Sequence, residues 1–318
     1  PINLSGILYN KTRVDTPLFN AFGSANTQSR RFITGAYYDT GYPESAVSGI
    51  TETASMTAPD PQYWDRKNAE NVTQIFQRSV AVSYRKMANG SDLTNYVNTE
   101  GTYSLGAGQP ATVGNTNNVP NELAFQIANQ MDSIKLDIET VIINGTFQDS
   151  LGSPAVADQT RGLVAAITSN VVAAGSAELS YDIIYTVAEK IAKSGSPFAI
   201  DSYLTVLSFE QFKQLQKVVA DEGLRIVPNT SAGTNVTSVV TPFGVMHFMP
   251  HRFMANGTAL CVCMPICRNV FQPTPGKGNF FYEELAKSGA SEDGQIFGQF
   301  GLDHGPAFMH GTITGLAT

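Results

Sequence analysis

Charged residues are scarce in this chain. Asp, Glu, Lys and Arg together make up 15% of its 318 residues, whereas about 25% is usual for a soluble protein. We therefore expect other copies of the chain to cover part of the surface. The net charge is −7 at pH 7, so there is no basic excess with which to grip nucleic-acid phosphates. Tight nucleic-acid binding through a basic face is excluded.

Long apolar runs and secretion signals are also missing. No stretch of about 18 apolar residues is present, so we expect no membrane partner. From Pro1 onward no basic segment leads into an apolar one, so no signal peptide is expected. The three cysteines, Cys261, Cys263 and Cys267, are an odd and clustered set. Such a set is a poor disulfide framework and fits a reducing compartment.

The cysteines and histidines are the first candidates for chemistry. The cysteines alternate along an apolar stretch, which favours buried thiols over a metal or redox cluster. His247 and His251 have the spacing of a helical metal pair, but Pro250 and a β pattern oppose a helix there. His304 and His310 are separated by Gly305 and Pro306. We expect no metal and no cofactor.

Other catalytic patterns are equally incomplete. Gly276-Lys277-Gly278 lacks the frame of a phosphate-binding loop, and no nucleophile elbow is present. Asp132, Asp137 and Glu139 share one helical stretch. A solvated or interface stripe explains these carboxylates better than a catalytic pair does. The sequence therefore predicts that the protein is not an enzyme.

The first part of the chain reads as extended structure. Residues 1–25 are expected to form an arm, because Pro17 biases Thr16 toward extended geometry. Two β-type stretches follow, near 30–38 and 72–84, and they flank about 30 polar residues. This pattern predicts a long hairpin, which is not stable alone in water and needs a partner surface. Trp64, the only tryptophan, lies in the polar part and is an interface hint.

Residues 120–144 carry the clearest helical signal. Apolar residues from Leu123 to Val141 recur at spacings of three and four, which predicts an amphipathic helix of about seven turns ending at Asn144-Gly145. A second unit then shows helices near 181–192 and 209–219, and short strands up to 271. Residues 279–318 read as β structure returning to the first unit. The predicted class is α+β, with one unit inserted into the other.

Several local strings, in this order, resemble those of the major capsid proteins of tailed double-stranded DNA bacteriophages, which have the Hong Kong 97-type fold. Each is weak alone, but together they span nearly the whole chain. The strings are Thr16-Pro17-Leu18-Phe19, Asn71-Val72-Thr73-Gln74-Ile75-Phe76, Val80-x-Val82-Ser83, Asn121-Glu122-Leu123-Ala124-Phe125-Gln126, Asp137-Ile138-Glu139, Thr160-Arg161-Gly162-Leu163, Thr241-Pro242-Phe243-Gly244 and Leu285-Ala286-Lys287-Ser288-Gly289.

The resemblance implies a domain plan and a function. It implies an N-terminal arm (1–25), an E-loop hairpin over a neighbouring subunit (26–88), an inserted loop (89–119), a peripheral domain (120–175) with its spine helix (120–144), an axial domain (176–265) and a return to the peripheral domain (266–318). It also implies self-assembly into hexamers and pentamers of an icosahedral head around double-stranded DNA.

The same resemblance implies partners and contact residues. The partners are other copies, a portal protein at one vertex and, where needed, scaffold or decoration proteins, with packaged DNA held without tight specific binding. The chain would be assembled in the host cytoplasm and reside in the virion. The residues expected to contact neighbouring subunits are Phe19, Arg30, Arg31, Tyr37, Tyr38, Trp64 and Phe76.

Three alternatives stay open. An encapsulin-like nanocompartment shell has the same fold, and its genetic neighbour would be a cargo enzyme rather than portal and terminase. A cytosolic hydrolase would use His247, His251 or the cysteines, although no complete constellation supports it. A surface adhesin would suit the Asn-, Thr- and Gly-rich loops, but the missing signal sequence weighs against it.

Overall fold

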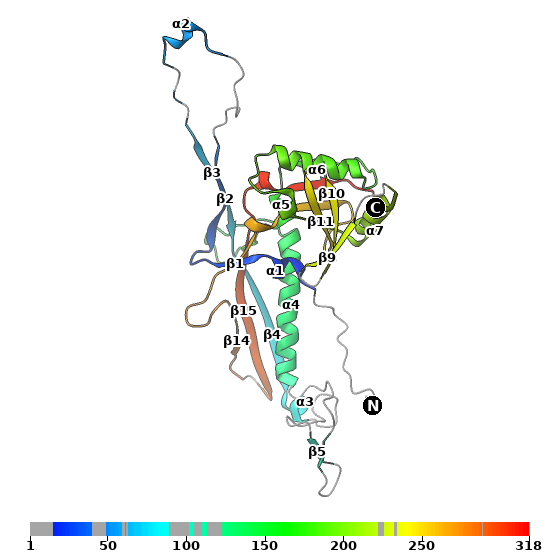
Figure 1. The fold of residues 1–318 in the computed structure, drawn as a ribbon. Coiled ribbons are helices and arrows are strands. Elements are labelled where there is room, and N and C mark those ends of the chain that lie inside the picture. Colours follow the sequence, from blue (N-terminus) through cyan, green and yellow to red (C-terminus); the bar gives the residue numbers. More distant parts are fainter. Residues whose placement is uncertain are drawn as a thin grey trace.

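The computed structural model shows an elongated molecule with a hairpin projecting from one end of its body (Figure 1). The structure describes residues 15–39, 49–58, 61, 63–88, 102–104, 110–112, 122–221, 226–231, 234–287 and 289–317. Within these ranges no helix combines the length and the apolar character needed to cross a bilayer.

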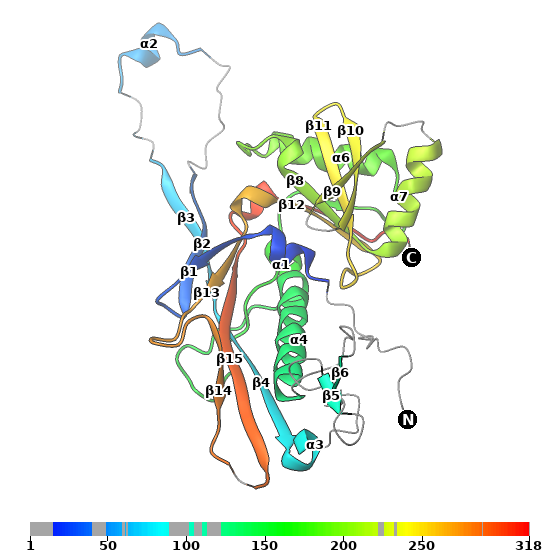
Figure 2. The same cartoon turned by 60° about the horizontal axis from the view of Figure 1, so that its bottom comes forward.

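The first unit is built on a five-stranded sheet with α4 (Glu122–Asn144) lying along it (Figures 1 and 2). Its central strand, β15 (Ser291–Asp303), pairs antiparallel with β4 (Gln74–Ser83) over ten residue pairs. The other strands are β1 (Gly23–Asn26), β13 (Arg268–Phe271) and β14 (Phe280–Glu284). A long helix on long strands makes this unit a flat, extended body.

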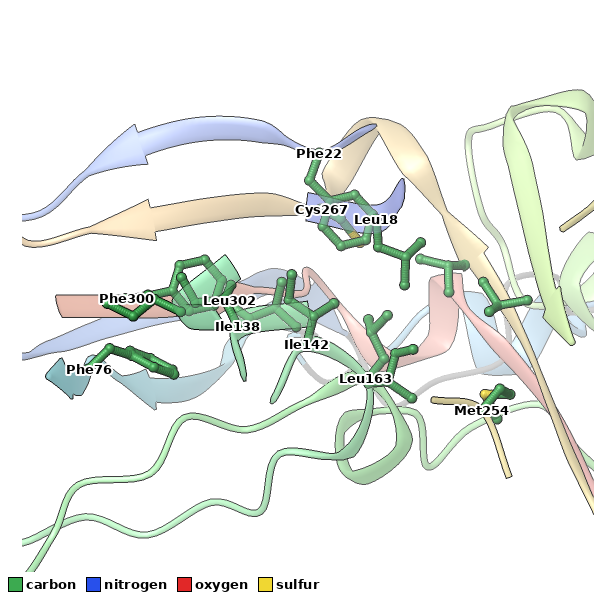
Figure 3. Packing of buried hydrophobic residues seen from close by; sticks show 14 of the residues in the cluster. Leu18, Phe22, Phe76, Ile138, Ile142, Leu163, Met254, Cys267, Phe300 and Leu302 are labelled. Atoms are coloured by element: carbon green, nitrogen blue, oxygen red, sulfur yellow. The ribbon is translucent and has the colours of Figure 1, made fainter. Parts of the chain in front are cut away.

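The predicted helix over 120–144 is confirmed by α4. Its inward stripe, including Ile134, Ile138 and Ile142, is at most 2% exposed. These residues pack against Phe76 from β4 and Phe300 from β15 in one core cluster (Figure 3). Apolar residues at helical spacing on one face of α4 thus meet alternating apolar residues on two strands.

The arm differs from its prediction. Pro17–Ala21 form a short helix, α1, and only β1 after it is extended. Proline is well suited to the first helical position because its fixed φ matches the helix and it has no N–H to satisfy. Leu18 is fully buried in the core, so this turn is anchored to the body. Residues 1–14 of the expected arm lie outside the described residues.

The hairpin also pairs differently from the prediction. Strand β2 (Arg31–Asp39) pairs with β3 (Asp65–Val72), and α2 (Glu52–Ser55) lies farther out. The stretch expected to be the second hairpin strand changes partner at Thr73, after which β4 pairs with β15. The reason is burial: the alternating Phe76, Val80 and Val82 face the core of the body.

The second unit is a seven-stranded sheet. Its order is β7-β16-β12-β8-β11-β10-β9. The two helices α6 (Tyr181–Lys193) and α7 (Phe209–Asp221) contribute to one core cluster with one face of the sheet, whereas alternate residues of β8 and β12 join the core that contains α4. The strands are β7 (Val171–Ala173), β8 (Tyr203–Leu207), β9 (Ile226–Ser231), β10 (Thr234–Thr241), β11 (Gly244–Pro250), β12 (Thr258–Cys263) and β16 (Gly311–Thr314).

This sheet extends beyond the expected axial segment 176–265. Strand β16 pairs with β12 and β7, so the end of the segment expected to return to the first unit belongs to this sheet. Ile313 is 1% exposed in the same cluster as Val187 and Ile191 of α6. Strand β16 belongs to the second sheet, and not to the first unit, because it is buried, apolar and paired with a strand on each side.

Short elements complete the described chain. The segment near 161–167 contains a helical turn, α5 (Leu163–Ala166). In the expected loop 89–119, β5 (Thr102–Ser104) pairs with β6 (Pro110–Thr112), and the other residues of that loop lie outside the described ones. The remaining elements are α3 (Tyr84–Ala88) and three 3₁₀ turns, η1 (Ile200–Ser202), η2 (Met264–Ile266) and η3 (Ala307–Met309).

Candidate inter-subunit surfaces

The outer part of the hairpin exposes large apolar side chains. Ile50, Met56, Tyr63 and Trp64 are each between 70% and 80% exposed. In the sequence they lie on either side of α2, which stands beyond the paired strands and away from the body (Figure 1). These four exposed side chains fall in one stretch of the chain, exposed apolar surface marks interaction sites, and a two-stranded ribbon is not stable alone. This part of the chain is therefore suited to lie on another surface.

The root of the hairpin is fixed to the body. At Gly35 the strand has a register shift and a φ of +60°. A Cβ there would lie 2.5 Å from the carbonyl oxygen of Gly305, so only glycine allows this approach. The Thr34 hydroxyl donates to Asp303 (2.5 Å) and accepts the N–H of Gly305 (3.2 Å). These contacts set the direction in which the hairpin leaves the body.

Arg30 and Arg31 are used within their own chain. The Arg30 guanidinium donates to Asp149 and Asp158, both at 2.6 Å, and to Ser150 at 3.0 Å. Arg31 pairs with Glu70 and lies 3.2 Å from Asp149. The hydrogen bond from Arg30, followed by that from the Leu151 N–H, lowers the pKa of Asp149. Both arginines therefore hold the loop after α4 to the root of the hairpin.

Like the two arginines, the aromatic residues among the seven predicted contact residues differ in their surroundings: some pack on their own chain and others are exposed. Phe19 stacks on Phe271 and Phe300 of its own chain, and Phe76 is 6% exposed in the core. The expectation of a neighbour contact is corrected for Phe76, because its side chain is enclosed by its own chain. Tyr37 packs on Phe308 with ring centroids 5.1 Å apart. Tyr38 and Trp64 are 67% and 70% exposed, and their contact role stays a prediction.

The three carboxylates of the long helix do not converge. Asp132 pairs with Lys135, and Asp137 pairs with Arg78, both on the solvent side. Glu139 is fully buried instead. Its carboxylate accepts the N–H groups of Leu18 (2.9 Å) and Phe19 (2.8 Å) and contacts His251 Nε2 at 2.8 Å. Glu139 thus joins α1, α4 and the end of β11, a role that the sequence pattern did not reveal.

The cysteines are confirmed as buried thiols without disulfides. Burial raises the pKa of Cys261 to about 12 and that of Cys263 to about 11. His247 lies on β11, as the β pattern predicted, and contacts the Ser238 hydroxyl at 2.8 Å. Across the described ranges no three His, Cys, Asp or Glu side chains gather as metal ligands do. The three cysteines and His251, His304 and His310 are buried, whereas His247 is half-buried.

The far end of β15 is acidic. Glu283 and Glu284 on β14 lie beside Glu292 and Asp293 at the start of β15. Burial raises the pKa of Tyr282, and the negative field of Glu284, Glu292 and Asp293 raises it further. Glu283 pairs with Lys277, and Glu292 pairs with Lys287. We call residues 283–287 and 289–293 the acidic turn.

A basic pocket lies at the other end of β15. Its volume is about 600 Å³, and its lining includes Arg66, Lys67, Arg161 and His304 but no Asp or Glu among the described residues. Lys67 is paired with Asp39, and Arg161 lies over the ring of Phe147. Burial lowers the pKa of His304. The pocket is thus a positive site on a protein of net negative charge.

The tip of the second unit offers a further aromatic contact. Phe243, in the turn between β10 and β11, is 37% exposed. Its ring lies 5.2 Å from that of Tyr185 on α6. Aromatic side chains of this kind are enriched at protein interfaces.

Comparison with known proteins gives one family and one fold. The family model of the SU10 major capsid protein matches residues 2–317. No curated protein matches the chain by sequence. Among the solved structures that are similar to this chain are three at 10% identity, and at this identity the likeness concerns the fold alone.

The first of these is the cyanophage A-1(L) capsid, with a TM-score of 0.66, covering 98% of this chain and 96% of that one. The match to the capsid of a native GTA particle has a TM-score of 0.60 and covers 100% of this chain and 95% of that one. The match to the SrpI encapsulin of Synechococcus elongatus PCC 7942 has a TM-score of 0.60 and covers 98% of this chain and 93% of that one.

Proposed function

Because the chain belongs to the SU10 major capsid protein family, we propose that it assembles with copies of itself into the hexamers and pentamers of an icosahedral head around double-stranded DNA. It is a structural protein that forms a shell, it has the Hong Kong 97-type fold, and its place is the capsid of the virion. The hexamers and pentamers, the DNA content and assembly in the host cytoplasm are the proposed part.

The projecting hairpin is the observation that carries this proposal. Its outer apolar side chains, Met56 and Trp64 among them, have no covering surface in the described part of the chain. Its root is held against Gly305, so the paired strands β2 and β3 leave the body in a set direction. In a shell, each hairpin would lie on the next subunit, as the resemblance implies for an E-loop. Closed symmetry then multiplies a modest pairwise energy.

The partners follow from the same proposal. A portal protein would occupy one vertex, and scaffold or decoration proteins would add to the shell where they are needed. The net charge of −7 supports packaged DNA that is held without tight specific binding. We also propose that the protein is not an enzyme, in line with its structural family. Turnover by the purified protein that is lost in His247→Ala would contradict this.

The proposal is tested by electron microscopy and sedimentation of the full chain expressed alone. We expect shells, tubes or capsomer rings, and we expect them to be lost in the double variant Met56→Ala/Trp64→Ala while the thermal midpoint of the subunit is unchanged. The matched control is Leu151→Ala, which truncates an 81% exposed side chain outside the hairpin. Particles that form equally in the double variant would show that the hairpin does not carry assembly.

A cellular nanocompartment is the second candidate, favoured by the likeness to the SrpI encapsulin. The two functions differ in what the shell encloses. Purified particles that hold a cargo enzyme and no DNA, with a cargo gene beside the shell gene, would favour the nanocompartment. Particles with packaged DNA, and neighbouring portal and terminase genes, would favour the viral head.

A further inference from the structure

We propose that the basic pocket at the root of the hairpin receives the acidic turn, residues 283–287 and 289–293, of a second copy of this chain. The inference rests on the proposed shell function and names a contact within the shell.

The positive wall of the pocket is the first step. Arg66 has no ion-pair partner among the described residues, and the Arg161 guanidinium is 4.5 Å from the centroid of the Phe147 ring rather than beside a carboxylate. No carboxylate in the described chain lines the pocket. Guanidinium groups present forked donors that match carboxylates. An acidic side chain is therefore the group that these two arginines can bind best.

His304 lies in the wall of the pocket with its ring enclosed by its own chain. Its side chain is 2% exposed, and Nδ1 lies 2.7 Å from the Gly305 carbonyl oxygen, which can only accept. Nδ1 must then carry the proton, so Nε2 is a buried acceptor, and it has no partner in the described chain. A buried polar atom in this state is costly. Because Nε2 is closed off from solvent, it does not itself bind the incoming group, and the two arginines carry the recognition.

The acidic turn is the matching surface. Glu284 and Asp293 make no ion pair among the described residues, and Glu284 is exposed. Strand β15 runs for 13 residues between Ser291 and Asp303. At about 3.3 Å per residue it separates the acidic turn from the pocket, which begins at His304, by about 40 Å. One chain cannot fill its own pocket in this fold, so the turn must come from another copy.

The contact has the geometry of a repeating array. The pocket and the acidic turn are different surfaces at opposite ends of one strand, so the contact is heterologous and each copy donates one turn and accepts another. This differs from the contact of the hairpin tip, which uses apolar side chains. The charge pair would fix which copy docks where, since like charges brought together repel each other.

Complementary charge reversal tests this proposal in the full chain. The variants are Arg66→Glu, Glu284→Arg and the two combined, and Lys217→Glu on α7 is the control for a simple change of net charge. We expect about a tenfold or larger loss of assembled particles in each single variant, recovery in the combined variant, and no loss in the control. All four should keep the wild-type thermal midpoint before assembly, because Arg66, Glu284 and Lys217 are exposed.

Two outcomes overturn the inference while leaving the shell function intact: single variants that assemble like the wild type, or a combined variant that fails as the singles do. A shell that does not form even from the wild type contradicts the proposed self-assembly instead.

A disulfide test then still decides the contact. Asn68→Cys on the pocket wall and Glu284→Cys should give intermolecular crosslinks only when both are present, since the three native cysteines are buried. Their absence in concentrated, mildly oxidised protein would refute the contact.

Discussion

Glu139 and His251 form a buried pair, with 2.8 Å between Oε1 and Nε2. His251 Nδ1 accepts the N–H of Phe253 at 3.2 Å, so Nε2 carries the proton and donates to the carboxylate. The same carboxylate accepts two N–H groups at the start of α1. One side chain of α4 thus holds the first described turn of the chain and the end of a strand of the second unit.

Glu139→Gln tests this pair. The amide has one oxygen for three donors, and its own NH₂ group faces N–H groups. We expect the free energy of unfolding to fall by about 2–3 kcal/mol, measured by urea denaturation of unassembled protein. Asp137→Asn, on the solvent side of the same helix, should cost less than about 1 kcal/mol. Equal effects of the two substitutions would show that the buried pair adds nothing.

Gly35→Ala tests the root of the hairpin. The positive φ and the approach to Gly305 leave no room for a methyl group, so we expect a loss of at least about 1–2 kcal/mol of stability and fewer particles. Gly49→Ala is the matched control in the same hairpin, because nothing lies within 4 Å of a Cβ there. Normal particle yield from Gly35→Ala would mean that the hairpin leaves the body without this constraint.

His310 makes stability depend on pH. Burial lowers its pKa from 6.5 to about 4. Between these values the unfolded chain binds a proton that the folded chain does not, so stability falls as the pH drops through this window, by up to about 3 kcal/mol. Burial lowers the pKa of His304 as well, which acts in the same direction. The free energy of unfolding, measured by denaturation at a series of pH values from 4 to 7, should depend less on pH in His310→Asn. An unchanged pH dependence would refute the assignment to His310.

The thiols should be unreactive in the folded protein. All three are at most 1% exposed, and burial raises their pKa, which leaves almost no thiolate at neutral pH. A thiol reagent should label none of them in native subunits and all three after denaturation. Fast labelling of the native protein would place at least one of them at the surface.

The sequence predicted best where periodicity and burial coincide. The spacing from Leu123 to Val141 predicted α4, and the alternation around Cys261 predicted buried thiols on a strand. It predicted pairing less well, because Val72 and Phe76 belong to one extended run but pair with different strands on either side of Thr73. Nothing local in the residue pattern marks that change.

The candidate surfaces depend on long-range placement. Exposure of Trp64 followed from its polar surroundings, whereas Phe76 was expected to face a neighbour and is buried in its own chain. Arg30 and Arg31 form ion pairs within their own chain, and their contact with neighbours stays a prediction. Arg30 meets Asp149 across 119 residues, and Glu139 meets Leu18 across 121. Such pairs arise only when distant segments are brought together. The basic pocket arises in the same way, from Arg66, Arg161 and His304.

Strand β16 affects the order in which the molecule can be completed during synthesis. It fills the place between β7 and β12, yet β13, β14 and β15 are made before it. Until Gly311–Thr314 have left the ribosome, β7 and β12 each present an unpaired edge. The second unit is therefore finished only after the first has all its strands. An incomplete chain has no finished subunit to add, so the growing shell takes up only copies whose translation has passed this strand.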